Sequence, residues 1–217
     1  MLNILAGSDE LCFNTWCSNR LFKRFFDIAV SATILILLSP LFLLVALLIR
    51  LDSKGPIFFC QTRVGKQGKL FFMWKFRSMY VDAEQRKKNL VKQNEMHGGI
   101  LFKIKRDPRV TRVGRLIRKS SVDELPQLWN VLKGNMSLVG PRPPLPSEVT
   151  KYTFYHFQRL KVTPGITCIW QISGRSEIPF AQQVEMDLEY INSQSFVNDI
   201  VILLKTVPAV LKARGAY

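Results

Sequence analysis

The longest apolar run of the chain, residues 28–49, carries no charged side chain and has Ser39 and Pro40 near its middle. As a helix rising about 1.5 Å per residue it is about 33 Å long, enough to cross the hydrocarbon core of a bilayer. Pro40 frees the backbone carbonyl of Ile36, which needs another partner in lipid, and Ser39 or interfacial water can supply it. The pattern therefore predicts a membrane helix that either spans the bilayer with a kink or turns back at Pro40.

Basic residues flank the run on both sides: Arg20, Lys23 and Arg24 before it, and Arg50, Lys54, Arg63 and Lys66 after it. Because cytoplasmic flanks carry the excess of lysine and arginine, both ends of the run suit the cytoplasm. The residues alone leave the spanning and the re-entrant topology equally open. Residues 1–22 form a mixed leader whose apolar and aromatic side chains suit the membrane interface, and the run is too long for the apolar part of a signal peptide.

Shorter patterns along the rest of the chain predict a hairpin and several helices. Two β-rich runs joined by glycine-containing residues predict a β-hairpin within residues 56–79. Residues 81–95 are highly charged and predict a solvated helix, and residues 148–162 predict an aromatic-rich helix. Residues 198–214 alternate apolar and basic side chains, which suits either a helix in the membrane interface or a terminal helix packed on the core.

Two proline-rich segments, residues 140–144 and 163–167, are incompatible with central strands and helix interiors. They predict stiff loops that hold Arg142 and Thr167 in a pre-set backbone.

A periodic apolar face predicts one more helix: Leu125, Leu128, Trp129 and Leu132. A serine or Asp123 can cap its start, Pro126 fits its first turn, and Gly134 fits the position just past its end. Asp123 and Glu124 are therefore expected at or near a helix N-terminus, where backbone donors and the helix dipole favour phosphate.

Charge narrows the class of partner. The chain of 217 residues has 31 lysines and arginines against 16 acids, a net charge of +15, which predicts a polyanionic partner: anionic lipid, a phosphorylated substrate or nucleic acid. The four cysteines are scattered and there are only two histidines, which argues against a zinc site and suits a reducing compartment. About 160 residues follow the membrane segment, enough for one domain with its own core.

The basic residues are concentrated in residues 103–119, which hold eight lysines and arginines and one acid, Asp107. Four arginines recur at every third position: Arg109, Arg112, Arg115 and Arg118. A solvated face explains such a run in most proteins. Here the spacing favours an anion site, because like charges packed this closely repel one another unless an anion lies among them.

Asp123 and Glu124 directly follow this basic run. Adjacent carboxylates suit a division of labour in which one attacks and the other holds a metal, and Mg²⁺ is the ion that such hard oxygen ligands prefer. The plainer interpretation is an acid pair in a first helical turn without chemistry. The electropositive setting favours phosphoryl transfer. No P-loop or GxGxxG motif is present, which argues against a Walker-type or Rossmann nucleotide site.

Five segments together closely resemble the bacterial sugar transferase family: residues 23–28 (KRFFDI), the apolar run with its central Ser39-Pro40, residues 75–79 (KFRSM), residues 107–143 and residues 164–175. These are monotopic polyprenyl-phosphate hexose-1-phosphate transferases that begin the assembly of exopolysaccharide, O-antigen and related glycans. The resemblance covers about Lys23 to the C-terminus. Larger members carry further membrane helices and another domain before this core, so the chain looks like the minimal catalytic unit.

The resemblance implies an α+β, mostly helical fold with a re-entrant helix-break-helix, a small β-hairpin and amphipathic interfacial helices. Ser39 and Pro40 match the break that makes the family's membrane helix re-entrant. The expected organisation is a leader over residues 1–22, a membrane hairpin over residues 23–52 and a catalytic domain over residues 53–217. The expected location is the cytoplasmic face of the bacterial inner membrane.

The resemblance also implies roles for individual residues. The family's Asp-Glu dyad falls on Asp123 and Glu124. The aspartate attacks the sugar-linked phosphorus of a UDP-sugar and releases UMP, and the phosphate of the polyprenyl carrier then attacks the covalent phosphosugar. Glu124 matches the residue that binds Mg²⁺. Lys75, Arg118 and Arg142 match positions expected to bind phosphates.

Six further residues are active-site candidates: Arg77, Arg112, Thr167, Gln171, Arg175 and Asp187. The family commonly reads PGITG where this chain has Cys168 at the last position, so a backbone that needs glycine there would differ in this chain. The expected partners are a UDP-sugar, polyprenyl phosphate and membrane lipid, with self-association left open and nucleic acid not expected. Two rivals are a membrane-anchored module that binds nucleic acid or anionic lipid, and direct transfer without a covalent intermediate.

Overall fold

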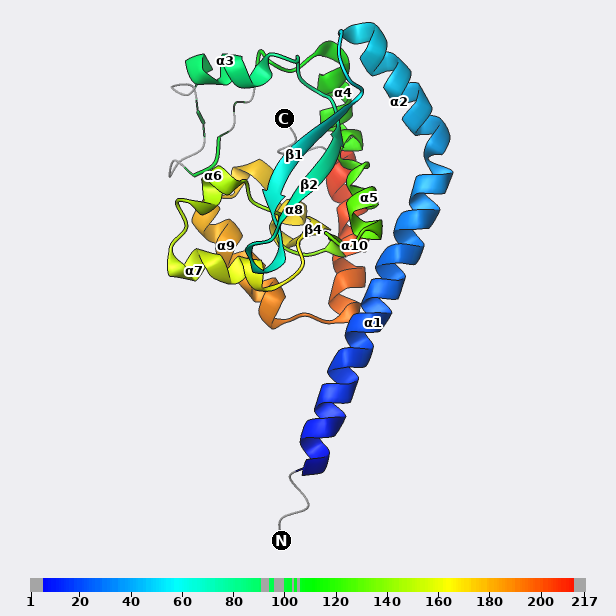
Figure 1. Cartoon of the computed structure of the whole chain (residues 1–217), viewed down its shortest axis with the longest axis vertical. Helices are drawn as coiled ribbons and strands as arrows, with labels where there is room; N and C mark the ends of the chain where they lie inside the picture. The colour runs from blue at the N-terminus through cyan, green and yellow to red at the C-terminus, as the bar shows by residue number, and fades with distance from the viewer. Residues whose placement is uncertain (1–5, 91–93, 96–99, 103, 105, 213–217) are drawn as a thin grey trace.

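The structure, a computed structural model, describes residues 6–90, 94–95, 100–102, 104 and 106–212. Helices predominate and the two sheets are small, each with two strands among the described residues (Figure 1). The first half of the chain contains α1 (Ala6–Leu37), α2 (Ser39–Asp52), β1 (Phe58–Val64), the 3-10 turn η1 (Lys66–Gly68), β2 (Leu70–Phe76), α3 (Ala83–Leu90), α4 (Arg112–Lys119) and the 3-10 turn η3 (Val122–Glu124). The second half contains α5 (Gln127–Leu132), β3 (Ser137–Val139), α6 (Pro146–Val149), α7 (Phe154–Phe157), η4 (Gln158–Lys161), β4 (Gly165–Thr167), α8 (Ile169–Ser173), η5 (Arg175–Glu177), α9 (Phe180–Asn192) and α10 (Phe196–Lys212).

The apolar run breaks where the sequence predicts. The segments Leu21–Leu37 and Ser39–Asp52 meet at an angle of 60°. The Ser39 hydroxyl donates a 2.8 Å hydrogen bond to the carbonyl of Ile36, which confirms the predicted partner for the carbonyl that Pro40 frees. Within the described part of the chain, no single helix has the length and apolarity to cross a membrane, whereas this bent pair does by length and composition, as a broken span or a re-entrant loop.

Charged and polar side chains of α1 fasten it to the rest of the chain. Arg24 donates hydrogen bonds of 2.6 and 2.9 Å to the carbonyls of Val131 and Leu132 at the end of α5. Asp27 is buried and accepts a 2.7 Å hydrogen bond from the Ser137 hydroxyl at the start of β3. Since the last carbonyls of a helix have no partner within it, Arg24 closes α5 while it holds α1 in place.

The predicted hairpin is confirmed as the antiparallel pair β1–β2, with Phe59 opposite Lys75 and Arg63 opposite Phe71. Directly opposed residues share a face of the sheet, so Arg63 and Lys75 project to the same side. Phe71 is buried on that side with the core, whereas Phe72 on the other side is 65% exposed.

Two groups of buried side chains form the core. The larger group joins β2, α5, β3, α9 and α10, and α1 packs against it; its buried members are Phe71, Met73, Leu128, Val131, Met136, Leu138, Val139, Tyr190 and Ile202. The smaller group joins α2, β2 and α4 through Val45, Ile49, Phe76 and Ile117. The hairpin and α5 are thus held between the bent helix pair and the C-terminal helices.

The prediction that residues 163–167 form a loop is wrong in part. Gly165–Thr167 is strand β4, which pairs in parallel with Ser137–Val139. Pro164 stays just outside the strand, so it costs no ladder hydrogen bond. A Cβ on Gly165 would lie 2.1 Å from the nitrogen of Gly140, so only glycine allows the two proline-rich segments to approach this closely.

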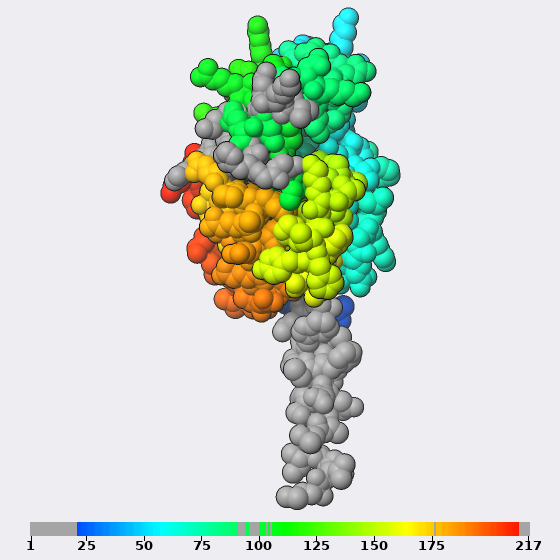
Figure 2. All heavy atoms as spheres, turned by 90° about the vertical axis from the view of Figure 1, so that its left-hand side faces the viewer, coloured from blue at the N-terminus to red at the C-terminus, as the bar shows by residue number. Residues whose placement is uncertain are grey.

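Two predicted helices differ in extent, and a third differs in the exposure of one side chain. The charged helix is limited to α3 (Ala83–Leu90), and part of the predicted stretch lies outside the described residues. The aromatic-rich segment is not one helix but α6, α7 and η4, and it lies beside α9 on one face of the molecule (Figure 2). Trp129, predicted on the buried face of α5, is 49% exposed, and the Lys133 ammonium lies 5.4 Å from its ring centroid.

The C-terminal helix α10 has one buried side and one exposed apolar side. Asp199 and Ile202 are buried, and Asp199 accepts a 2.8 Å hydrogen bond from the Tyr190 hydroxyl of α9. The opposite side exposes a row of apolar residues: Val197, Val201, Leu204, Val207 and Leu211. One side of α10 therefore packs on the core, while the other is apolar and uncovered among the described residues.

Candidate active site

The acid pair lies in a short turn rather than inside a helix. Asp123 and Glu124 belong to η3, which follows Ser121 in the left-handed conformation (φ 56°), and α5 begins only at Gln127. Asp123 is 8% exposed, whereas the Glu124 side chain keeps 32% of its surface exposed. The turn thus buries one carboxylate and leaves the other partly buried.

Lys75 joins the hairpin to this turn. Its ammonium donates a 2.6 Å hydrogen bond to Oε1 of Glu124. Burial raises the pKa of Asp123 to about 6, with Lys75 and Arg118 opposing the rise and Glu124 adding to it. The pKa of Glu124 is lowered, because Lys75, Arg142 and Arg175 outweigh the effect of burial. Neighbouring carboxylates therefore differ in their affinity for a proton, as in sites where two acids have separate roles.

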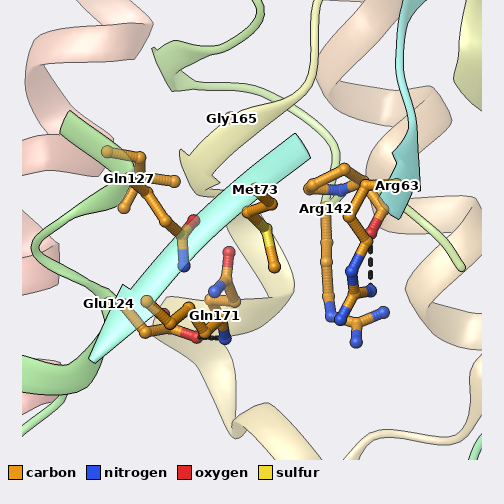
Figure 3. Close-up of a pocket in the computed structure, with 10 residues that line it drawn as sticks. Arg63, Met73, Glu124, Gln127, Arg142, Gly165 and Gln171 are labelled. Carbon is orange, nitrogen blue, oxygen red and sulfur yellow. Dashed lines mark hydrogen bonds and ion pairs between the residues drawn. The ribbon is translucent and has the colours of Figure 1, made fainter. Parts of the chain in front are cut away.

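A small cleft lies directly beside the turn (Figure 3). Its lining comes from β1, β2, η3, α5, the first proline-rich segment, β4 and α8: Arg63, Met73, Lys75, Glu124, Gln127, Arg142, Pro143, Gly165, Ile166 and Gln171. Glu124 and Gln127 lie on one side of the cleft and Arg63 and Arg142 on the other, in the view of Figure 3. The cleft therefore combines an acid with three cationic side chains, a composition suited to a phosphorylated ligand and a metal.

Several residues singled out from the sequence meet here although they are far apart in the chain. Lys75, Glu124, Arg142 and Gln171 line the cleft. Asp123 belongs to the same turn as Glu124, and Arg118 is close enough to lower its pKa. Arg175, which has φ 55°, lies near enough to Glu124 for the two charges to stabilise each other.

Two candidate arginines lie elsewhere. Arg77 donates hydrogen bonds of 2.7 and 2.6 Å to the carbonyls of Ser53 and Lys54, so it closes the C-terminal end of α2. Arg112 is exposed at the start of α4. Neither belongs to the lining of the cleft.

Thr167 and Asp187 are buried and do not belong to the lining of the cleft. The Thr167 hydroxyl lies 2.8 Å from that of Thr206 on α10. Asp187 accepts a 2.7 Å hydrogen bond from Arg159. The first contact joins β4 to α10, and the second joins α9 to the turn η4.

The regular spacing of the arginines does not produce one cationic face. Arg109 precedes α4, is 5% exposed and forms a bidentate ion pair with Asp107, with Nη2 2.7 Å from Oδ2. Arg112 and Arg115 are exposed. Of these four arginines, Arg118 is the one whose charge lowers the pKa of Asp123. The interpretation of the run as a single anion site is therefore not reproduced by the described residues.

The residues present fit Mg²⁺ in the manner that substrate-bridged sites use. No group of three or more histidine, cysteine or acidic side chains that could hold a metal occurs in the described ranges. Mg²⁺ usually binds through one or two carboxylates together with substrate phosphates and water, so a full protein cage is not required. Glu124 is the exposed member of the pair and already attracts a cation, the Lys75 ammonium.

Cys168, the departure from the PGITG pattern, has an extended backbone (φ −155°) that any residue adopts. Its side chain is buried, and the thiol donates a 3.1 Å hydrogen bond to Oε1 of Gln171. Burial raises the pKa of the thiol well above its usual range, so the cysteine stays protonated. The backbone at this position therefore does not require glycine, and the cysteine contacts a residue of the cleft wall.

Two polar residues of the cleft were not predicted from the sequence as site residues. Gln127 lies in the first turn of α5, and Arg63 lies in β1 with 5% of its surface exposed. Burial and the nearby charge of Arg142 lower the pKa of Arg63 to about 9. The sequence signal for Arg63 is an arginine on the inner face of a predicted hairpin, because a buried charge needs a partner.

Comparison with known proteins decides the family. Residues 18–213 match the family model described as "Bacterial sugar transferase". The chain belongs to the bacterial sugar transferase family. The resemblance seen in its motifs is thereby confirmed.

Among sugar transferases, the chain is 48% identical over 200 residues to "Galactosyl transferase CpsE" of Streptococcus agalactiae and 44% identical over 203 residues to "Undecaprenyl-phosphate galactose phosphotransferase" of Salmonella typhimurium. These alignments cover 92% of this chain but 44% and 42% of the two relatives. "Exopolysaccharide production protein ExoY" of Sinorhizobium fredii is 41% identical, with 90% of this chain and 88% of that protein aligned. The chain thus spans less than half of the first two relatives and most of the third.

Proposed function

We propose that this sugar transferase moves a sugar-1-phosphate from a UDP-sugar to polyprenyl phosphate through a covalent intermediate on Asp123. The observation that carries the proposal is the contact between Lys75 and Glu124 beside the buried Asp123, at the edge of a cleft lined by arginines. The relatives named as undecaprenyl-phosphate galactose and glucose phosphotransferases support this class of reaction.

The chemistry divides into two displacements at one phosphorus atom. In the first, a carboxylate oxygen of Asp123 attacks the sugar-linked phosphorus, the bond to the bridging oxygen breaks, and UMP leaves with the electron pair. In the second, a phosphate oxygen of polyprenyl phosphate attacks the same phosphorus and the Asp123 carboxylate leaves. A carboxylate needs no base to become a nucleophile above its pKa, so the site requires positioning and charge rather than a proton acceptor.

The cations of the cleft supply that charge. Lys75 and Arg142 approach from β2 and from the first proline-rich segment, and Arg118 lies near Asp123. Fixed cations around a phosphorus centre stabilise the charge that develops in the transition state. When bound at Glu124, Mg²⁺ supplies further neutralisation of the diphosphate.

The bent helix pair provides the route to a lipid acceptor. We infer that α1 and α2 enter the membrane and turn back at the Ser39-Pro40 break, so that the cleft stays at the cytoplasmic face of the bacterial inner membrane. Apolar side chains of α2 are exposed as such a location requires, including Leu43 and Leu51 at 74% and 75%. The product, a polyprenyl-diphospho-sugar, would begin exopolysaccharide, O-antigen or related glycan synthesis.

Release of UMP before any acceptor is added tests the proposal. The purified chain is incubated with Mg²⁺ and a panel that includes UDP-galactose and UDP-glucose. We expect about one equivalent of UMP per active chain and a phosphosugar on the peptide that contains Asp123, seen by mass spectrometry. The variant Asp123→Asn should lose both signals. Release of UMP only when undecaprenyl phosphate is present, with no adduct trapped, would replace the covalent route by direct transfer.

A further inference from the structure

Arg63 is a buried cation whose hydrogen bonds are incompletely matched. It is 5% exposed on the inner face of β1. One terminal nitrogen donates a 3.0 Å hydrogen bond to the carbonyl of Pro143, and the other donates a 2.7 Å hydrogen bond to Oε1 of Gln61. Its Nε is buried without a hydrogen-bond partner in the described part of the chain. A buried guanidinium normally has its donors satisfied, so the protein leaves this donor unmatched.

The charge around Arg63 is unbalanced as well. The ion pairs among the described residues include none to Arg63. Arg142 lies beside it, close enough for the like charges to lower the pKa of Arg63. Glu148 is the acid that most stabilises the charge of Arg63, and it is already engaged at 3.5 Å by Arg142 and at 2.8 Å by the backbone nitrogen of Leu145. Two cations therefore share one acid, and burial makes this imbalance costly without an anion.

The acid on the other side of the cleft, Glu124, stabilises the charge of Arg63 less than Glu148 does. Glu124 is held by Lys75 at 2.6 Å. Glu124 and the arginine pair lie on different sides of the cleft in Figure 3. The cleft thus has one side where acid and lysine are matched and another where positive charge is in excess.

We propose that Arg63, together with Arg142, binds a phosphate group of a substrate on the side of the cleft away from the Asp123–Glu124 turn. The inference rests on the proposed function, which brings a diphosphate and a phosphate monoester to this cleft. A planar guanidinium binds phosphate oxygens through two donors at once, whereas lysine offers a point charge. Pro143 fixes the orientation of Arg63, because its carbonyl anchors one terminal nitrogen and its ring stiffens the segment that carries Arg142.

Two phosphates could occupy this place: that of the nucleotide in the donor, or that of the lipid acceptor. The donor arm of the test measures binding of UDP to the full chain in nanodiscs by calorimetry, without turnover. The acceptor arm measures the KM for undecaprenyl phosphate in the complete reaction. Arg63→Lys retains the buried charge and Arg63→Gln retains a donor for Pro143, so the pair separates loss of phosphate binding from loss of the fold.

If the phosphate of the nucleotide donor binds here, the Kd for UDP should rise about tenfold or more in both variants. If the phosphate of the lipid acceptor binds here, UDP binding should be unchanged and the KM for undecaprenyl phosphate should rise to a similar extent. A rise in both constants also supports the proposal. Arg109→Lys is the matched control, because Arg109 is equally buried but is paired with Asp107 outside the cleft. It should leave both constants unchanged.

Folded Arg63 variants that bind UDP and use undecaprenyl phosphate like the unaltered chain would overturn the proposal and leave Arg63 as an anchor for Pro143 alone. Failure of the covalent route would appear differently, as the absence of an adduct in the unaltered chain. UDP binding is measured without chemistry, so the two failures are distinguishable.

Discussion

The Lys75 ammonium lies 2.6 Å from Oε1 of Glu124, while the adjacent Asp123 is buried with its pKa raised to about 6. One lysine from the hairpin thus separates the behaviour of two neighbouring carboxylates. The ionised, partly exposed Glu124 suits a cation ligand. The buried Asp123 suits attack on phosphorus, because it has few waters to lose when substrate enters.

This arrangement predicts that Glu124→Gln loses metal-dependent activity. The amide keeps the shape of the side chain but removes the charge that attracts Mg²⁺, so the rate of UMP release should fall about 100-fold or more and its dependence on Mg²⁺ should weaken. Titration of Mg²⁺ against the rate measures both. Glu185→Gln, at an exposed position of α9, is the control and should retain the activity. Full activity of the unaltered chain in excess chelator would contradict the metal assignment.

The raised pKa of Asp123 predicts a pH dependence of the first displacement. The carboxylate must be ionised to attack, so the rate of UMP release should rise with pH through about 6 and level off above it. Single-turnover measurements at saturating donor, from about one pH unit below this midpoint to about two units above it, give the profile. A rate that stays constant down to pH 5 would show that Asp123 ionises like an exposed aspartate or does not attack.

The same shift predicts a stabilising substitution. Because the folded pKa of Asp123, about 6, lies above the ordinary value of 3.8, the folded chain holds this proton more tightly than the unfolded chain. The resulting stability is present at pH values below the ordinary pKa and is lost as the pH rises through about 6. Asp123→Asn should therefore raise the free energy of unfolding at neutral pH by roughly 1–3 kcal/mol in chelator, although it abolishes transfer.

Thermal unfolding of the two chains as a function of pH measures this effect. The difference should shrink toward zero in acid, where Asp123 is protonated in both states. An equal or lower stability of Asp123→Asn at neutral pH would mean that the cations beside Asp123 outweigh its burial.

The hydrogen bonds of Arg24 predict that its removal lowers the stability of the chain. Arg24→Ala leaves the carbonyls of Val131 and Leu132 without their donor, and should lower the free energy of unfolding by about 1–3 kcal/mol. Thermal unfolding in detergent measures the change. Arg86→Ala is the control, because its ion pair with Asp82 is exposed, and it should change stability by less than about 0.5 kcal/mol. Equal effects of the two substitutions would remove Arg24 as an anchor.

The helix break predicts a topology. In a cysteine-free variant, single cysteines placed in the leader and in the domain should both resist an impermeant thiol reagent in intact cells. Pro40→Ala restores the missing backbone hydrogen bond and should shift the leader toward labelling from outside, whereas Ser39→Ala removes the hydrogen bond to Ile36 but keeps the break. Labelling of the leader in the chain with Pro40 intact would rule out the re-entrant arrangement.

Local features of the fold follow from the sequence. The Ser39-Pro40 break, the partner of the Ile36 carbonyl and the hairpin are set by neighbouring residues, because proline chemistry and turn geometry act over a few positions. Gly134, with φ 82°, ends the segment after α5 as its position predicts. The same holds for the acid pair, since adjacency in the chain guarantees adjacency in space.

Tertiary contacts decided the rest. Gly165–Thr167 becomes a strand only because Ser137–Val139 lies beside it, and Arg109 pairs with Asp107 instead of joining an anion site. Arg63 and Lys75 reach one cleft because the register of the hairpin turns both inward toward η3 and the first proline-rich segment. Such outcomes depend on which distant groups share a buried, low-dielectric environment, and short-range patterns of polarity do not encode that.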